Sequence, residues 1–269
     1  MRSFALRLAA PLLLGASLAA HAQAPDTVFL EDLTSPELSA QIRAGKTTLI
    51  VPIGGTEQNG PHMALGKHNV RAKMLAERIA IVLGNALVAP VIAYVPEGAV
   101  NPPTGHMRYP GTITVPADTY RKMLESAARS FKLAGFRDIV LLGDSGDYQQ
   151  DDQSVAQQLN REWAGTNVRV HAIRDYYRVP TLWFAETLKS RGYSDAEIGT
   201  HAGLADTSLM LALDPRMVRS DLMQPGAGQK GLPGVAGDPR RASAELGKIA
   251  VDAIVAQTVQ AIRAAAASH

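Results

Sequence analysis

The feature that most restricts the fold of this chain is a repeated alternation of short apolar runs with longer helical segments. Four apolar runs have the length of buried strands, at 48–53, 86–95, 138–142 and 168–173. Helical segments are expected between them, at 70–82, 118–134 and 149–163. This alternation predicts an α/β fold in one domain, with a mostly parallel central sheet between two helical layers, a three-layer αβα arrangement.

Further helices are expected at both ends of the domain. A first helix at 32–44 has Thr34 or Ser35 as its N-cap and Pro36 at its first position. A long alanine-rich helix is expected at 243–266.

The second half of the chain also contains less regular stretches. Residues 207–213 are expected to form a short helix or strand. Two stretches rich in glycine and proline, 101–114 and 224–239, are predicted to be loops, and the second could cover a site.

The N-terminus has the parts of a secretory signal peptide. Arg2 and Arg7 give a basic start, an apolar run follows, and Ala22-Gln23-Ala24 fits a cleavage site, so we assign residues 1–24 to the signal. Since Pro11 interrupts the apolar run, a permanent transmembrane helix is not expected. The protein should be periplasmic or secreted, without membrane contact after cleavage.

Residues 25–269 would form the mature domain, and their composition excludes several kinds of site. The formal net charge of +2 comes from the two arginines of the signal, so the mature chain is formally neutral. We therefore expect no nucleic-acid partner. The chain has no cysteine, which excludes disulfides and sulfur ligands, so any metal must be held by histidine, carboxylate or carbonyl groups.

Candidate metal ligands follow two of the predicted strands. The first strand breaks into a loop that carries Glu57, Asn59, His62 and His68, and the third ends just before Asp144. Because the carboxyl ends of parallel strands meet at one edge of a sheet, Glu57 and Asp144 should lie on the same edge, where α/β proteins bind ligands. Carboxylates and imidazoles together form a common metal-binding set.

The distribution of histidines supports a site at this edge. Between the signal and the C-terminal residue, four of the five histidines fall in predicted loops: His62, His68, His106 and His201. His171 lies on a predicted strand, where a core or surface role is expected. Histidines gathered in loops at strand ends indicate a functional site.

The loop after the first strand, together with four later blocks, resembles the creatininase (creatinine amidohydrolase) family. EQNGPHMALGKH at 57–68 resembles the family signature E-Q-H-G-P-H-L-P-L-x-T-D. Later stretches resemble further family blocks in the same order: GHMRYPGTITV, VLLGDSGDYQ, HAGLADTS and GVAGDPRRASAELGK. The resemblance covers most of the mature chain and implies a creatininase-like fold in a divergent exported member.

Members of this family are metal-dependent amidohydrolases in which a pair of divalent ions activates water for attack on a C–N bond. Glu57 matches the first glutamate ligand of the family. The chain departs from the family at three other ligand positions, because Asn59 replaces a histidine, His68 the bridging aspartate and Asp144 a histidine. Gly146 stands where some members have a further glutamate.

These departures predict one metal ion rather than two. A bridging carboxylate can hold two ions, whereas an imidazole has one free lone pair and Asn59 is a weak ligand. Glu57, His68 and Asp144 would still supply two carboxylates and one imidazole with an open position, which suits one Zn, Mn or Fe ion.

The resemblance also implies roles for four other residues. His201 would protonate the leaving nitrogen as general acid, and Asp206 would orient a base or the substrate. His62 and His106 would contact the substrate or the metal ligands. Leu204 replaces a family glutamate, which removes another polar group.

The sequence therefore predicts a metal-dependent amidohydrolase that cleaves a non-peptide C–N bond, in a cyclic or linear amide, in a small-molecule substrate. Two alternatives stay open. A degenerate relative could bind a small molecule without turning it over, or a hydrolase without metal could use His201 with Asp206. The latter lacks a nucleophile-elbow serine, since residues 143–146 do not have the G-x-S-x-G spacing. The resemblance also implies a homo-oligomer.

Overall fold

A parallel four-stranded sheet forms the centre of the computed structural model, which describes residues 25–224 and 234–268. Its strands are β1 (Thr48–Ile53), β2 (Ala86–Val88), β3 (Asp138–Gly143) and β4 (Arg169–Ala172), in the spatial order β2-β1-β3-β4. β1 and β3 are the two inner strands, and they pair along their full length, from Thr48 opposite Asp138 to Ile53 opposite Gly143.

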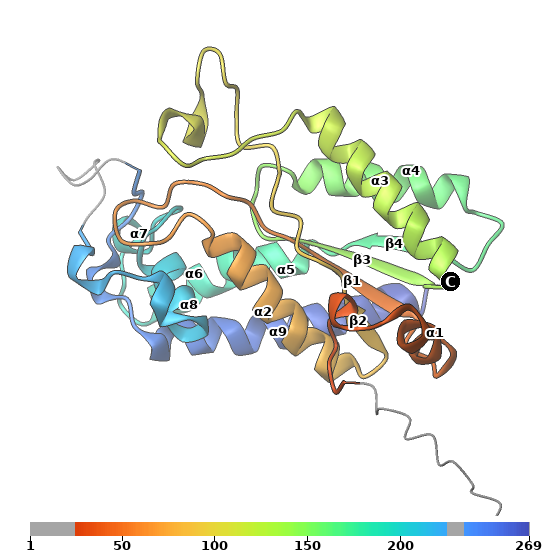
Figure 1. Cartoon of the computed structure of the whole chain (residues 1–269). Coiled ribbons are helices and arrows are strands. Elements are labelled where there is room, and N and C mark those ends of the chain that lie inside the picture. The colour runs from red at the N-terminus through yellow and green to blue at the C-terminus, as the bar shows by residue number, and fades with distance from the viewer. Residues whose placement is uncertain (1–24, 225–233, 269) are drawn as a thin grey trace, which may run out of the picture.

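Strand side chains alternate between the two faces of the sheet, which produces two separate apolar cores. The helices that cover the faces are α3 (Ala117–Ala134) and α4 (Gln149–Glu162) on one side, and α2 (Lys67–Leu83) and α9 (Ala244–Ala266) on the other (Figure 1). Leu49 and Val51 of β1 point towards α3 and α4, whereas Ile50 between them points towards α2 and α9. The predicted three-layer αβα fold is confirmed.

α9 packs along α8 (Leu204–Leu213), and the two helices approach closely at one glycine. A Cβ on Gly247 would lie 1.8 Å from the carbonyl oxygen of Ser208, so this crossing requires glycine. In the described part of the chain, α9 is the one helix long and apolar enough to cross a membrane. Its apolar residues, including Leu246, Ile254 and Ile262, lie in the core instead.

Several helix boundaries follow from the local chemistry that the sequence predicts. α1 (Ser35–Arg43) begins after Thr34, whose side chain forms a capping box with Glu37. α3 ends at Gly135, which adopts the left-handed conformation with φ of 109°. The segment expected at 207–213 as helix or strand is the helix α8.

Two regions differ from the prediction. The strand expected at 86–95 ends at Val88, because Pro90 has no N–H to continue the ladder, and only an isolated bridge at Ile92 follows. Between β4 and α8 the chain forms helical segments that were not expected: α5 (Asp175–Arg178), a π-helical turn (Val179–Trp183), α6 (Phe184–Ser190) and α7 (Asp195–Ile198).

Short 3-10 turns complete the structure: Leu30–Asp32, Gly105–Arg108, Pro215–Met217, Ser220–Leu222 and Pro239–Arg241. Gly105–Arg108 lies inside the stretch predicted to be a loop at 101–114. The signal assigned to residues 1–24, and residues 225–233 of the loop expected at 224–239, lie outside the described residues.

Candidate functional site

A polar pocket opens at the carboxyl edge of β1 and β3, where the sequence places Glu57 and Asp144. Side chains from several separate segments form its wall: Glu57, Lys67, His68, Arg71, His106, Asp144, Asp147, Tyr177, Thr181, Thr200, His201 and Asp206. The N–H of Asp144 donates to the carbonyl of Ile53 at 3.0 Å, which extends the pairing of β1 and β3 into the site. The predicted juxtaposition of the two strand ends is therefore present.

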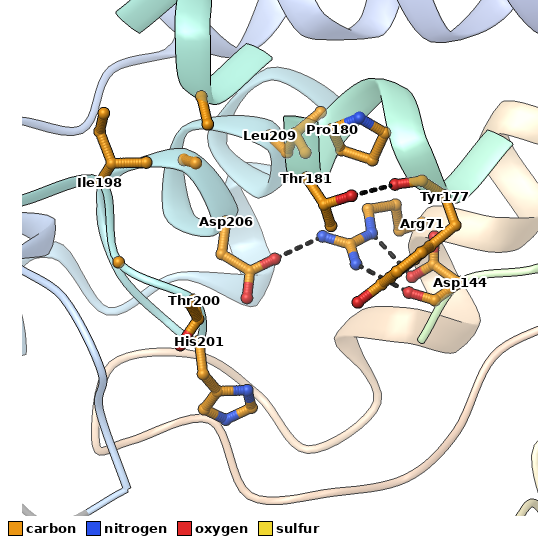
Figure 2. Close-up of a pocket in the computed structure, with 13 residues that line it drawn as sticks. Arg71, Asp144, Tyr177, Pro180, Thr181, Ile198, Thr200, His201, Asp206 and Leu209 are labelled. Carbon is orange, nitrogen blue, oxygen red and sulfur yellow. Dashed lines mark hydrogen bonds and ion pairs between the residues drawn. The ribbon is translucent and has the colours of Figure 1, made fainter. Parts of the chain in front are cut away.

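Two buried cations enter this pocket from the first turns of α2. Lys67 is completely buried, and its Nζ pairs with Asp206. Arg71 donates from Nε to Asp144 at 2.7 Å and from Nη1 to Asp206 at 2.6 Å, so its guanidinium lies between the two carboxylates (Figure 2). Burial alone would raise the pKa of Asp206, but Lys67 and Arg71 hold it well below its ordinary value.

His68, which precedes Arg71 by one turn of α2, lies between two carboxylates. Its Nδ1 is 2.5 Å from Asp144 Oδ2, and its Nε2 is 2.7 Å from Glu57 Oε1. Burial and Lys67 oppose protonation, but the two carboxylates outweigh them and raise the pKa of His68. An imidazolium with a carboxylate on each nitrogen is a cation and has no lone pair for a metal.

Asp144 is also fully engaged. Its Oδ1 accepts a hydrogen bond from the Tyr176 hydroxyl at 2.8 Å, and its Oδ2 accepts from His68 and Arg71. Burial would raise the pKa of Asp144, but Arg71 and His68 lower it. We call the set Lys67, His68, Arg71, Asp144 and Asp206 the paired half of the pocket.

The predicted ligands Glu57, His68 and Asp144 thus lie together, but as a hydrogen-bonded chain and not around a shared open point. Both ring nitrogens of His68 and both carboxyl oxygens of Asp144 are already engaged in hydrogen bonds, so neither residue presents a free ligand atom. Glu57 is the member that also faces other metal-ligating side chains. This geometry favours a different set of ligands from the one expected from sequence.

In the described part of the chain, one group of side chains has metal-ligand geometry: Glu57, His106 and His201, whose ligand atoms all lie within 4.8 Å of one another. His106 Nε2 is 3.3 Å from Glu57 Oε2, and His201 Nδ1 is 3.7 Å from Glu57 Oε1. The rings of the two histidines lie with centroids 4.4 Å apart and are tilted by 36° to one another. A carboxylate and two imidazoles suit Zn, Mn or Fe.

Gln58 sets the orientation of both rings. Its Nε2 is 2.9 Å from His106 Nδ1, and its backbone oxygen is 2.9 Å from His201 Nε2. Since a carbonyl can only accept, His201 Nε2 carries the hydrogen in the neutral ring, and Nδ1 presents its lone pair towards Glu57. Burial and the Lys67 charge lower the pKa of His201 to about 4, which keeps the ring neutral near pH 7.

Glu97, which was not expected in the site, lies beside Glu57. The residue is 1 % exposed, and neither of its carboxyl oxygens has a hydrogen-bond partner. Burial and the Glu57 charge raise the pKa of Glu97 to about 9. We call Glu57, Glu97, His106 and His201 the open half of the pocket.

Other predicted residues have different surroundings from those expected. His62 is completely buried and bonded to Thr207 Oγ1 at 3.0 Å, so it has no surface for the expected contact with substrate. Asn59 is also buried and donates to the carbonyl of Glu57 at 2.8 Å, which makes it a loop-stabilising residue. Asp206 is bonded to Lys67, Arg71 and the N–H of Ala202, and no hydrogen bond joins it to His201.

Tyr177 and Asp147 also belong to the pocket wall, and sequence reasoning did not assign either to the site. A Cβ on Gly146 would lie 2.7 Å from the Tyr177 hydroxyl, so the absence of a side chain at Gly146 leaves room for the phenol. Burial and the Glu57 charge raise the pKa of Asp147. The signal for Asp147 was its place four residues after the end of β3. For Tyr177 it was an aromatic stretch, Tyr176-Tyr177 and Trp183-Phe184, which suggests a pocket wall, an oligomer contact or core packing.

Comparisons with known proteins agree with the fold. The sequence pattern of the family described as creatininase, creatinine amidohydrolase, matches residues 31–262. Creatinine amidohydrolase of Pseudomonas putida is 27 % identical over 259 residues, which cover 88 % of this chain and 96 % of the relative. The mycofactocin precursor peptide peptidase of Mycobacterium tuberculosis (strain CDC 1551 / Oshkosh) is 24 % identical, covering 83 % and 88 % respectively.

A solved structure titled "Creatininase Mn" superposes with a TM-score of 0.71 at 27 % identity, covering 88 % of this chain and 98 % of that one. The match therefore extends over the whole sheet and both helical layers. Because the family pattern spans most of the chain, this protein belongs to the creatininase family.

Proposed function

We propose that this protein is a metal-dependent hydrolase that cleaves a non-peptide C–N bond in a small polar molecule, with one divalent ion held by Glu57, His106 and His201. The observation that carries the proposal is the convergence of these three ligand atoms within 4.8 Å in the wall of a polar pocket. The relatives named as creatinine amidohydrolase and as a peptidase support hydrolysis of a C–N bond.

The paired half supports one ion rather than two. Lys67, His68 and Arg71 already place three positive charges beside Asp144 and Asp206, and each of these carboxylates is bonded to at least one of them. A second ion in this half would have to displace a buried cation. Removal of one partner from such a pair is unfavourable because it leaves the other charge unpaired.

A bound divalent ion would lower the pKa of water and polarise a carbonyl oxygen. Side chains of the pocket would orient the substrate and supply the proton for the leaving nitrogen. The hydroxyls of Tyr177, Thr181 and Thr200 line the wall and can orient a polar substrate by hydrogen bonds. Asp147 lines the same pocket, and its raised pKa favours a carboxyl that can hold a proton and deliver it to a leaving nitrogen.

In this proposal His201 is a ligand and not the general acid expected from sequence, because its lowered pKa leaves no proton to donate from Nδ1 near pH 7. The hydrolase without metal that would use His201 with Asp206 is not supported, since Asp206 is bonded to Lys67 and Arg71.

Export through the signal at residues 1–24, a periplasmic or secreted location and a homo-oligomeric state are also part of the proposal. Export is tested by N-terminal sequencing of the protein recovered from the periplasm. The mature chain should begin at Pro25 or within a few residues of it. A mature protein that retains Arg2 in the cytoplasm would contradict export.

The experiment that tests the activity combines metal content with an amide screen. Elemental mass spectrometry of the purified protein should give about one ion per chain, lost in Glu57→Gln, His106→Ala and His201→Ala. His171→Ala, which changes a histidine bonded to Asp138 outside the pocket, should keep the ion. The loaded protein should release amine or carboxylate from at least one small cyclic or linear amide.

Three outcomes would change the proposal. No bound metal after reconstitution would refute it. Two ions per chain would show that the paired half opens for a second ion. One ion, lost in the three variants, but no hydrolysis of any amide would favour the alternative in which a degenerate family member binds a small molecule.

A further inference from the structure

A second cavity adjoins the polar pocket and lies between α6, α7 and α8. Its volume is about 170 Å³, and it extends from His201 past the Arg71–Asp206 pair to Leu209 (Figure 2). Its polar lining residues also line the polar pocket: Arg71, Asp144, Tyr177, Thr181, Thr200, His201 and Asp206. The cavity is therefore a side branch of the proposed active site.

The other lining side chains of this cavity are apolar. We call them the apolar end: Pro180, Ala185, Ile198, Ala205 and Leu209. Figure 2 shows Pro180 and Leu209 on the other side of the Arg71–Asp206 pair from His201. Ile198 and Leu209 belong to the core beneath α2 and α9, and the two alanines pack against the same core. Because close packing fixes these side chains, the apolar end exists before any ligand binds.

The charged groups on the cavity wall are bonded to one another. Arg71 donates to Asp144 at 2.7 Å and to Asp206 at 2.6 Å. The second oxygen of Asp206 accepts from Lys67 and from the N–H of Ala202. A charged ligand would have to break one of these buried pairs, which is unfavourable, so the cavity favours an uncharged group.

Two hydroxyls of the wall are available to a ligand. Tyr177 and Thr200 line both the cavity and the polar pocket, and neither hydroxyl has a partner among the described residues. The Thr181 hydroxyl, by contrast, donates to the carbonyl of Tyr177 at 2.7 Å. Tyr177 and Thr200 can therefore bind the amide of a substrate beside His201. A group that reaches beyond them to the apolar end finds no polar side chain there, and an alkyl group has no hydrogen bonds to lose.

We propose that the apolar end is a specificity subsite for a short alkyl group of the substrate. The inference rests on the proposed function, because the amide of the same molecule must reach the ion. An apolar cavity of about 150 Å³ can hold benzene, so this one has room for about four to six carbon atoms. The substrate class is then an amide that has an alkyl chain of this size, with its polar end at the ion and its apolar end between α6 and α8.

Hydroxamates test the subsite, because they bind divalent ions through two oxygen atoms and can differ only in their alkyl tails. Acetohydroxamate has a one-carbon tail, and pentanohydroxamate has a four-carbon tail. Isothermal titration calorimetry of the metal-loaded wild type gives the two dissociation constants. Burial of each added methylene should strengthen binding about 4-fold, so we expect pentanohydroxamate to bind about 60-fold more tightly.

Ala185→Leu fills the apolar end and should reduce this ratio of dissociation constants by about 10-fold or more. Ala261→Leu is the matched control, because Ala261 is another half-buried alanine packed against the same core and does not line the cavity. Its ratio should equal that of the wild type.

If Ala185→Leu does not fold, Leu209→Ala decides the matter, because it enlarges the apolar end. Octanohydroxamate, whose tail exceeds the wild-type cavity, should then gain affinity relative to pentanohydroxamate. An unchanged ratio for these two probes would refute the proposal.

Equal affinities of acetohydroxamate and pentanohydroxamate for the wild type would refute the subsite and leave the proposed function intact. The same ratio in the wild type and in Ala185→Leu would place the tail elsewhere and would also refute the subsite, as would an equal reduction in Ala261→Leu. Absence of binding of either hydroxamate to the wild type would instead refute the proposed function, and the subsite with it.

Discussion

The two halves of the pocket both contain buried carboxyls, but Glu97 of the open half and the carboxylates of the paired half have opposite surroundings. In the paired half, Asp144 and Asp206 are buried with Lys67, His68 and Arg71, and both carboxylates have lowered pKa values. In the open half, Glu97 is equally buried but has no cation bonded to it, and its pKa is raised. The comparison shows that burial does not decide the charge of a carboxyl; the presence or absence of a bonded cation does.

The contrast also separates stability from function. A buried carboxylate that is matched by fixed side-chain cations holds the loops of the site together. A buried carboxyl without such a cation is unfavourable for the isolated fold and becomes favourable only with a proton or a bound ion. We therefore expect changes in the paired half to affect folding and changes in the open half to affect metal binding.

The largest expected effect is that of Arg71→Met. This variant leaves Asp144 and Asp206 with fewer partners in a buried place, and loss of one member of a buried ion pair costs about 3–5 kcal/mol of unfolding free energy. Urea unfolding measures the change. Arg129→Met, which removes an exposed pair with Glu162, is the control and should change stability little. Equal effects of the two variants would contradict the description of the paired half.

A buried carboxyl outside the pocket sharpens the comparison, because Asp152 has a hydroxyl partner, Tyr120, at 2.6 Å and no bonded cation. Burial raises its pKa from 3.8 to about 7. The folded state therefore binds the proton more tightly than the unfolded state does, and stability declines as the pH rises from 3.8 through about 7. Each unit of pKa difference corresponds to about 1.4 kcal/mol.

Asp152→Asn removes this titration. Its unfolding free energy, measured by urea unfolding at a series of pH values, should lack the decline that the wild type shows over that range. A decline of the same size in both proteins would mean that Asp152 is already ionised at low pH and that the lack of a cation is not enough to neutralise it.

Metal binding should stabilise the open half. With free Mn²⁺ at about 100 times its dissociation constant, the wild type should gain about 2.7 kcal/mol of unfolding free energy, seen as a higher melting temperature. His201→Ala should gain nothing from the same ion, because it loses one of the three converging ligands. Removal of the ion with a chelator should reverse the gain, and a gain of equal size in His201→Ala would place the ion elsewhere.

The smallest expected effect is that of Gly146→Ala, which tests the packing of Tyr177 against Gly146 in the pocket wall. The new Cβ would lie 2.7 Å from the Tyr177 hydroxyl, so the phenol must move. We expect this to lower the unfolding free energy by about 1 kcal/mol. Tyr177→Phe in the same chain should relieve part of this cost, which a double-mutant cycle by urea unfolding detects. Gly165→Ala, where nothing lies within 4 Å, is the control and should be near neutral.

Much of the fold could be predicted from local pattern. The alternation of apolar runs and helical segments gave β1 at its observed bounds and placed Glu57 and Asp144 at one edge, because the carboxyl ends of parallel strands always meet there. Helix ends at Thr34 and Gly135 followed from capping chemistry. The helical segments at 175–198 escaped prediction because they are short and Pro180 interrupts their pattern.

The site could be predicted only in part. Glu57, His106 and His201 were all recognised as candidates, but their grouping was not, because His201 reaches Glu57 from a segment more than 140 residues away. His68 was expected to bind metal, and its two carboxylate partners, which only the folded chain brings to both sides of the ring, make it a cation instead.

The sequence by itself determined the α/β class, the edge of the sheet at which chemistry-bearing residues gather, and the resemblance to the creatininase family, because periodicity, caps and motifs are properties of neighbouring residues. The tertiary structure decided which carboxyl has a cation and which, like Glu97, has none. Ion pairing and desolvation depend on distances of a few ångströms between residues far apart in the chain, and no local pattern contains those distances.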